Sequence, residues 1–272
     1  MPRTICSLAA PYQHNRSRER REIIIVDNGS ARVPEPGDFT GLDAEIRIIR
    51  QPAATASPVA AINTGLAAAC APLIGVWIDG ARLASPSLVD ACLAAAQLHP
   101  RPVVATLNYQ LGPALQFNSA RYDYDQRRED QMLAHIDWPS DGYRLFEIAV
   151  PELRTGPAGP MLESNALFLP RLLWDELGGY DPAFVEPGGG LANADAFLRA
   201  CALDGTQLIR VLGEGTFHQF HGGLSTSTPE SAIRTLQQGS RAYLRRRGNP
   251  VRPIREPGWL FDARAGCLVD YP

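Results

Sequence analysis

Short apolar runs recur along the chain, and each ends in a polar or glycine-containing turn. The clearest is Ile74–Ile78, which lies between a proline and a glycine and is followed by Asp79. Its length and boundaries predict a buried strand of a parallel sheet. Glu22–Val26 repeats the pattern and ends on Asp27. Ligands of open α/β sheets bind at the carboxyl ends of the strands, so both aspartates are candidates for function.

Helix signals alternate with these strands. Ser57-Pro58 and Ser85-Pro86 each place a capping serine before a proline and predict helices through about Cys70 and Leu98. Further strands are predicted at 46–49, 103–109, 167–169 and 208–212, and further helices at 170–177, 192–203 and 229–247. The alternation predicts an α/β fold with a mostly parallel central sheet flanked by helices.

Two segments lack a clear periodic pattern of apolar residues. Residues 110–160 and the proline-rich segment from Asn249 onward are therefore predicted to be irregular. The first contains Trp138, Tyr143 and Phe146, which could stack on a sugar or a base, or could form a small core of their own.

Composition narrows the class of protein. With 272 residues and 45% hydrophobic content, the chain can form one large domain or a domain with an extension. A formal charge of −3 gives no reason to expect nucleic acid. Five scattered cysteines without a CxxC pair indicate a reducing compartment, and no apolar run is long enough to span a bilayer. These features predict a cytoplasmic protein without a transmembrane segment.

Acidic and histidine residues supply the candidate chemistry. Asp27, Asp79, Asp195 and the pair His218 and His221 could converge at one sheet edge, where they would suit a divalent ion that holds a diphosphate. The alternative is that both histidines lie in a loop and make structural hydrogen bonds. Arg245–Arg247 could bind phosphate, or could be a solvated helix end that favours the helix dipole.

Four segments together resemble a known family. Glu22–Ser30 (EIIIVDNGS), Gly178–Phe184 (GGYDPAF) and Ala192–Ala200 (ANADAFLRA) are similar to motifs of family-2-type nucleotide-sugar glycosyltransferases, which have the GT-A fold. Glu163-Ser-Asn165, followed by the segment GEGTFHQFHGG, is similar to a bacterial subgroup. The resemblance extends from Arg3 to about Gly223.

The resemblance implies a role for each matching residue. Asp27, with Asn28 and Ser30, would bind the nucleoside. Asp79 would bind metal and diphosphate, with His221 as a further metal ligand and His218 beside it. Asn193 and Asp195 occupy the two acidic positions that face the acceptor, and Glu163 and Asn165 would line the sugar or acceptor side.

Three departures from the family pattern affect these roles. Ala81 replaces the second carboxylate of the DxD motif, so dependence on Mn²⁺ or Mg²⁺ is in doubt, and Arg82 could neutralise phosphate instead. Asn193 stands where the base is expected and cannot accept a proton, so Asp195 or Glu163 would take that role. The family's first strand has no counterpart, which suggests an upstream start, a short strand at Ile5–Leu8 in its place, or an impaired protein.

The resulting prediction is a glycosyltransferase that moves a sugar from a nucleoside diphosphate to a hydroxyl acceptor in polysaccharide or glycan assembly. Residues 1–223 would form the GT-A domain, and 224–272 a helix and tail packed near the active site. The acceptor could be a glycan, a lipid-linked or a small molecule, and the protein could associate with the inner face of the membrane. The alternatives are an inactive nucleotide-sugar binding homologue and a nucleotidyltransferase. Inversion and retention of configuration both stay open.

Overall fold

The computed structural model describes residues 1–14, 20–78, 80–153, 155–221 and 229–270. Its helices are α1 (Pro2–Leu8), α2 (Val59–Ala68), α3 (Leu88–Ala96), α4 (Gln126–His135), α5 (Arg171–Leu177), α6 (Ala192–Ala202) and α7 (Pro229–Arg247), with 3-10 turns η1 (Pro36–Phe39), η2 (Gln116–Tyr122), η3 (Gly142–Ile148) and η4 (Pro187–Gly189). Its strands are β1 (Glu22–Asp27), β2 (Glu45–Arg50), β3 (Leu73–Val76), β4 (Arg82–Ala84), β5 (Pro102–Leu111), β6 (Ala149–Pro151), β7 (Leu167–Pro170), β8 (Gln207–His218), β9 (Trp259–Asp262) and β10 (Cys267–Val269).

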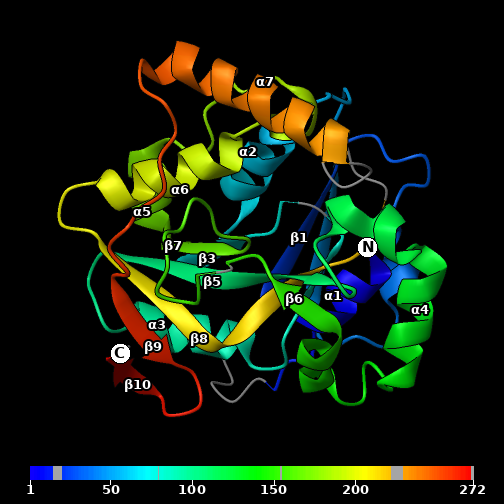
Figure 1. The fold of residues 1–272 in the computed structure, drawn as a ribbon. Coiled ribbons are helices and arrows are strands. Elements are labelled where there is room, and N and C mark those ends of the chain that lie inside the picture. The colour runs from blue at the N-terminus through cyan, green and yellow to red at the C-terminus, as the bar shows by residue number, and fades with distance from the viewer. Residues whose placement is uncertain (15–19, 79, 154, 222–228, 271–272) are drawn as a thin grey trace.

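The strands form two sheets. The larger has the order β10-β9-β8-β5-β7-β3, with β4 added to β8 and β6 added to β5, and the smaller contains β1 and β2 (Figure 1). The long ladder between β5 and β8 is parallel, as are β8–β9 and β1–β2, whereas the other pairs are antiparallel. The fold is therefore a mixed α/β fold with a central sheet.

Helices cover both faces of the large sheet because its strands are apolar on both sides. Along β5, Val103 and Ala105 pack into a core with α2, α5 and α6, while Val104 between them packs into a second core with α3. This two-residue alternation is what the strand geometry requires. Figure 1 shows α2, α5, α6 and α7 on one side of the sheet and α3 on the other.

Many of the predicted elements are confirmed. The helix predicted at 229–247 is α7 with the same bounds, and the one at 170–177 is α5, which ends at Gly178 with the left-handed φ of 72° that favours glycine. The predicted α/β class is confirmed as well. Within the part of the chain that the structure describes, no helix combines the length and apolar character needed to cross a bilayer.

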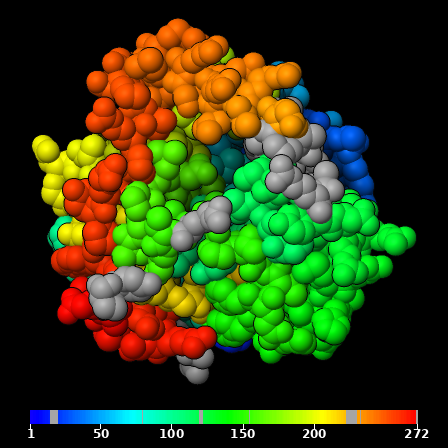
Figure 2. Space-filling model, in the orientation of Figure 1, coloured from blue at the N-terminus to red at the C-terminus, as the bar shows by residue number. Residues whose placement is uncertain are grey.

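Several local predictions are wrong. Residues 110–160 are not irregular, since they contain α4, whose Asp125 cap accepts from the Arg128 amide. The C-terminal segment is not an irregular tail either, because β9 and β10 extend the sheet along the edge of β8. Figure 2 shows the orange α7 as the upper border of this face, with the red C-terminal segment at lower left and the green middle of the chain at lower right.

Two further corrections concern the ends of strands. The apolar run predicted as a strand to Ile78 ends as β3 at Val76 and pairs antiparallel with β7, so it is not inside a parallel sheet. Residues 5–8 belong to helix α1 and not to a substitute strand. Asp79 lies outside the described residues, so its predicted metal and diphosphate role stays a prediction.

Candidate functional site

An amide and a carboxylate from distant parts of the chain form the centre of the site. Asn193, near the start of α6, donates from Nδ2 to Glu163 Oε2 over 3.0 Å and to Asn165 Oδ1 over 3.0 Å. Glu163 and Asn165 precede β7, so the contact joins a helix start to a strand start. The structure thus brings three of the predicted site residues together.

The Asn193 side chain is fixed in one orientation. The buried Tyr180 hydroxyl donates to Asn193 Oδ1 over 3.1 Å, which directs the amide nitrogen toward Glu163. Burial raises the pKa of Tyr180, so the phenol stays protonated and remains a donor. Asn108 holds Asn165 in turn, because the backbone amide of Asn165 donates to Asn108 Oδ1 over 3.2 Å. The Glu163 carboxylate therefore faces a hydrogen-bond donor, Asn193 Nδ2, whose orientation is already fixed.

Burial sets the protonation of Glu163. It raises the pKa of this carboxyl, and the charge of Glu152 adds to the rise. The Asn193 hydrogen bond and the charges of Arg82 and His218 act in the opposite direction. A carboxylate with a raised pKa is a better proton acceptor than an exposed one, which suits it to general base catalysis.

Arg82 brings a buried positive charge to the same region. It opens β4, only 8% of its surface is exposed, and it lies opposite His218 in the β4–β8 ladder. Its Nη1 is 4.0 Å from Glu152 Oε1. Within the described residues, neither Nε nor Nη1 of Arg82 makes a hydrogen bond. A buried guanidinium with unused donors is suited to bind an anion such as phosphate.

His218 and His221 face each other across 3.0 Å between their Nε2 atoms. The prediction that both lie in a loop is wrong for His218, which is the last residue of β8. Gln116 fixes its tautomer, because Nε2 of that amide donates to the His218 carbonyl and Oε1 lies 2.8 Å from His218 Nδ1. His218 Nδ1 therefore donates to Gln116, and Nε2 is the ring atom that faces His221.

The structure does not test the predicted metal centre. Across the described ranges, no group of three or more His, Cys, Asp or Glu side chains is placed to hold a metal ion. Asp79, which was predicted to bind the metal together with His221, lies outside those ranges. Dependence on Mn²⁺ or Mg²⁺ therefore remains a prediction.

Asp27 ends β1 with one carboxylate oxygen in use and one unused. Its Oδ1 accepts the Ser30 amide over 3.0 Å, whereas its buried Oδ2 has no hydrogen-bond partner among the described residues. The bonds from Ser30 lower the pKa of Asp27 and keep it ionised. Asn28 braces the neighbouring loop through two bonds with Thr55. Asp27 Oδ2 is thus an acceptor atom that no described residue uses.

Asp195 is held in an ion-pair network. It is fully buried, Arg199 Nε donates to Oδ2 over 2.7 Å, and Arg247 donates to both oxygens over 2.6 and 2.8 Å. Arg247 also binds Asp181. Arg246 contacts Glu186, so two of the three arginines at the end of α7 are engaged in ion pairs. These bonds occupy both carboxylate oxygens of Asp195.

Some residues that contact or influence the candidate site were absent from the sequence prediction. Tyr180, Glu152 and Gln116 orient or tune the predicted residues, but their effect depends on interactions across 11 to 102 positions in the chain. Trp138 and Phe146 join a core with Leu83 and Phe217, which favours the small-core interpretation of that aromatic cluster.

Comparison with known proteins supports the fold. No protein-family model and no curated protein matches the chain. Two crystal structures of S. aureus TarS 1–349, one in complex with UDP, match it with a TM-score of 0.51 and 10% identity. The match covers 89% of this chain but 60% and 61% of those chains, so the chain spans about three fifths of their length. The predicted GT-A fold is thereby confirmed.

Proposed function

We propose that the protein is a nucleotide-sugar glycosyltransferase in which Glu163 is the general base. The observation that supports this most strongly is the pairing of a partly buried, Asn193-bound carboxylate with a buried arginine whose Nε and Nη1 make no hydrogen bond within the described residues. Transfer of a sugar from a diphosphate to a hydroxyl needs a proton acceptor for the hydroxyl and positive charge for the leaving group.

Each residue has a defined role in the proposal. Glu163 would accept the proton of the acceptor hydroxyl as its oxygen attacks the anomeric carbon, and Asn193 and Asn165 would orient the reacting groups. Arg82 would stabilise the diphosphate as the bond from the anomeric carbon to the phosphate oxygen breaks. Asp27 Oδ2 would bind the base or ribose, with Asn28 and Ser30 shaping that turn. Asp195 would hold α6 and α7 together.

A divalent cation is a further part of the proposal. His218 and His221 would hold it with Asp79, and the cation would supply positive charge for the donor phosphates. Calorimetric titration of Mn²⁺ tests this part without any turnover. Loss of binding in both His221→Ala and Asp79→Asn variants would support it, whereas unchanged binding in either would contradict it.

Diphosphate release from a panel of nucleotide sugars tests the enzymatic proposal. The panel begins with UDP-sugars because a structural neighbour was crystallised with UDP. We expect release by the native chain and at least about a hundredfold loss in Glu163→Gln, which removes the base. The matched control is Glu147→Gln, a change at an exposed glutamate.

The second candidate is an inactive nucleotide-sugar binding protein. The amide of Asn193 at an otherwise acidic position favours it, because an amide cannot accept a proton. This candidate predicts thermal stabilisation by a nucleotide sugar without diphosphate release in the native chain. Release that survives in Glu163→Gln would instead contradict the assignment of the base.

A further inference from the structure

Helix α7 packs on the rest of the protein through one side. Gly239 approaches Leu191 so closely that an added Cβ would lie 3.2 Å from Leu191 Cγ. Ala242 and Tyr243 are buried, and Tyr243 belongs to the same core as α6. Positions i, i+3 and i+4 share one side of a helix, so these three residues form the inner side of α7. The opposite side of the helix faces outward.

The outer side of α7 carries large apolar side chains. Ile233 and Leu236 are each 56% exposed, and Leu244 is 45% exposed. Leu236 is less than one turn from Ile233, and Leu244 follows Ile233 by about three turns, so the three side chains form one apolar stripe along the helix. Surface helices normally place polar residues on the side that faces water. The apolar stripe therefore indicates contact with something less polar than water.

A basic stripe lies beside the apolar stripe on the outer side of α7. Arg234, Arg241 and Arg245 are exposed, and their spacing of seven and four positions aligns them along the helix. Among the described residues, the ion pairs of α7 involve Arg246 and Arg247 instead. The three exposed guanidinium groups are therefore available to an anion.

The charge of α7 is opposite to that of the whole chain. The helix sequence PESAIRTLQQGSRAYLRRR contains five arginines, and Glu230 is its one acidic residue, whereas the chain has a formal charge of −3. An anionic surface would therefore attract this side of the protein more than the others. Two copies of α7 packed face to face would instead bring like charges together, which is unfavourable. An apolar stripe beside a basic stripe is typical of helices that lie in the interface of an anionic membrane.

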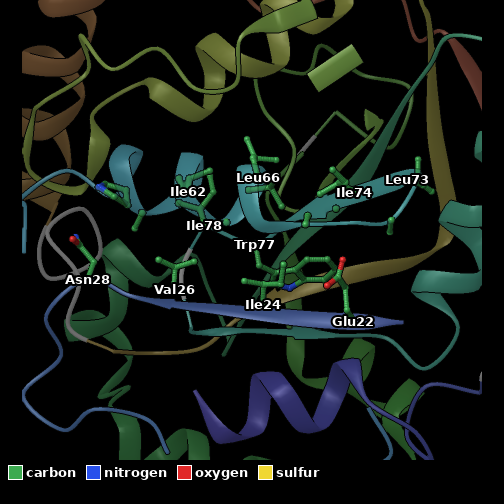
Figure 3. Close-up of a pocket in the computed structure, with 17 residues that line it drawn as sticks. Glu22, Ile24, Val26, Asn28, Ile62, Leu66, Leu73, Ile74, Trp77 and Ile78 are labelled. Atoms are coloured by element: carbon green, nitrogen blue, oxygen red, sulfur yellow. The ribbon is translucent and has the colours of Figure 1, made fainter. Parts of the chain in front are cut away.

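The shape of this surface also favours a membrane over a small ligand. Small molecules bind in concave sites, of the kind formed by the apolar pocket between β1, α2 and β3, which has a volume of about 250 Å³. Figure 3 shows Ile24, Ile62 and Ile74 in the lining of that pocket. α7 is instead an exposed helix at the outer border of the molecule (Figure 1). Such a helix can bury its apolar stripe in a fluid bilayer without a preformed groove.

We propose that the outer side of α7 docks the protein onto a membrane that contains anionic phospholipids. The apolar stripe would enter the boundary between headgroups and acyl chains, and the basic stripe would bind lipid phosphates beside it. At the end of the helix, Arg247 binds Asp195 on α6, two positions from Asn193. Docking would therefore fix the position of the candidate site relative to the lipid surface.

Vesicle co-sedimentation of the full chain tests the proposal. Vesicles of phosphatidylcholine mixed with phosphatidylglycerol are compared with vesicles of phosphatidylcholine alone. We expect the native chain to bind the mixed vesicles at least about tenfold more tightly, because each arginine near an anionic surface strengthens binding by about fivefold. Binding to the mixed vesicles should weaken as the salt concentration rises.

Single substitutions test the two stripes separately. Leu236→Ser should weaken binding to the mixed vesicles by about tenfold or more, because it removes a large apolar side chain from the lipid boundary. Arg241→Gln should weaken it by about fivefold. The matched controls are Leu98→Ser, which lies just past α3 on the opposite side of the sheet, and Arg127→Gln on α4. All four positions are exposed, so the variants should fold, and neither control should change binding.

Three results would overturn the proposal. One is the absence of binding between the native chain and the mixed vesicles. Another is equal binding to vesicles with and without phosphatidylglycerol, or an equal loss in Leu236→Ser and Leu98→Ser. The third is a dimer of the native chain in analytical ultracentrifugation that Leu236→Ser dissociates, which would assign the apolar stripe to contact between two copies. None of these readouts depends on sugar transfer, so failure here is distinguishable from failure of the proposed enzymatic function.

Discussion

The Nδ2 atom of Asn193 lies 3.0 Å from Glu163 Oε2, so an amide and not a second acid faces the candidate base. This arrangement stabilises the ionised form of Glu163. In Asn193→Asp, a carboxylate would replace the donor and oppose ionisation of its neighbour. We expect the acidic limb of the pH profile of kcat/KM to move up by about one pH unit or more.

The control for this change is Asn165→Asp, which adds a carboxylate on the other side of the Asn193 amide but leaves its bond to Glu163 in place. We expect Asn165→Asp to shift the acidic limb of the profile upward by less than Asn193→Asp does. An unchanged profile in Asn193→Asp would show that Glu163 is not the group that titrates.

Substitution of Glu152 should move the acidic limb of the kcat/KM profile in the opposite direction, toward lower pH. Its negative charge contributes to the raised pKa of Glu163, so Glu152→Gln should lower that pKa and extend activity toward acidic pH. The base must be ionised to act, so activity rises as pH increases through the pKa of Glu163. A kcat/KM profile between pH 4 and 8 would check the shift, and a shift toward higher pH would contradict it.

Arg82 should control affinity for the donor. Its substitution by alanine removes buried donors that we assign to the diphosphate, and hydrogen bonds to charged groups contribute about 1.5–3 kcal/mol. We therefore expect the Kd for a nucleotide sugar, measured by calorimetry, to rise by about 10- to 100-fold. Affinity for the uncharged nucleoside should not change.

The exposed Arg127→Ala variant is the control, since it removes the same charge outside the site. Equal losses of affinity in both variants would indicate a general electrostatic effect and not a phosphate contact. Equal affinity of Arg82→Ala and the native chain would contradict the assignment.

The sequence predicts elements whose signals are local. Gly178 ends α5 where only a left-handed residue fits, and α7 matches its predicted range, because caps and breakers act within one turn. The sequence does not predict α4, because this exposed, polar helix has few apolar positions. It does not predict β9 either, because the pairing of β9 depends on the distant edge of β8. The pairing of strands is a property of the whole chain and not of the segment.

In the candidate site, too, the sequence predicts what has a local signal and misses what depends on long-range contacts. Motif similarity found Glu163, Asn165 and Asn193, which the fold brings within hydrogen-bond distance. It also grouped Asp195 with them, but this side chain is neutralised by Arg199 and Arg247, and the second of these lies 52 positions away. Such a long-range ion pair leaves no local signal, so the sequence could not distinguish an acid open to substrate from one held by arginines.

The Arg247–Asp195 pair should be important for stability. Removal of Arg247 leaves the fully buried Asp195 with Arg199 as its one remaining partner among the described ion pairs, and also releases Asp181. Breaking a buried ion pair by deleting one partner is strongly destabilising. We expect Arg247→Ala to lower the free energy of unfolding by about 3 kcal/mol in urea denaturation. The exposed Arg245→Ala should change it by less than about 0.5 kcal/mol. Equal effects of the two substitutions would refute this role.

Glu129 should make the stability of the fold depend on pH. This buried carboxyl of α4 accepts bonds from the Tyr124 hydroxyl over 2.8 Å and from the Phe220 amide over 2.7 Å. Burial raises its pKa from 4.5 to about 7. Below pH 4.5 the folded and unfolded chains both hold the proton, and between 4.5 and 7 only the folded chain does, so ionisation increasingly favours unfolding as pH rises.

Above pH 7 the folded chain has lost all of the stability that protonated Glu129 contributes, which is on the order of 3 kcal/mol. Glu129→Gln keeps an oxygen that can accept both hydrogen bonds but cannot ionise. We therefore expect the variant to match the native chain in urea denaturation at pH 4.5 and to exceed it in stability at pH 8. Glu147→Gln, at an exposed position, should show no such difference. A native chain that gains stability relative to Glu129→Gln as pH rises would mean that the Glu129 carboxylate is stabilised by its surroundings, opposite to the effect of its burial.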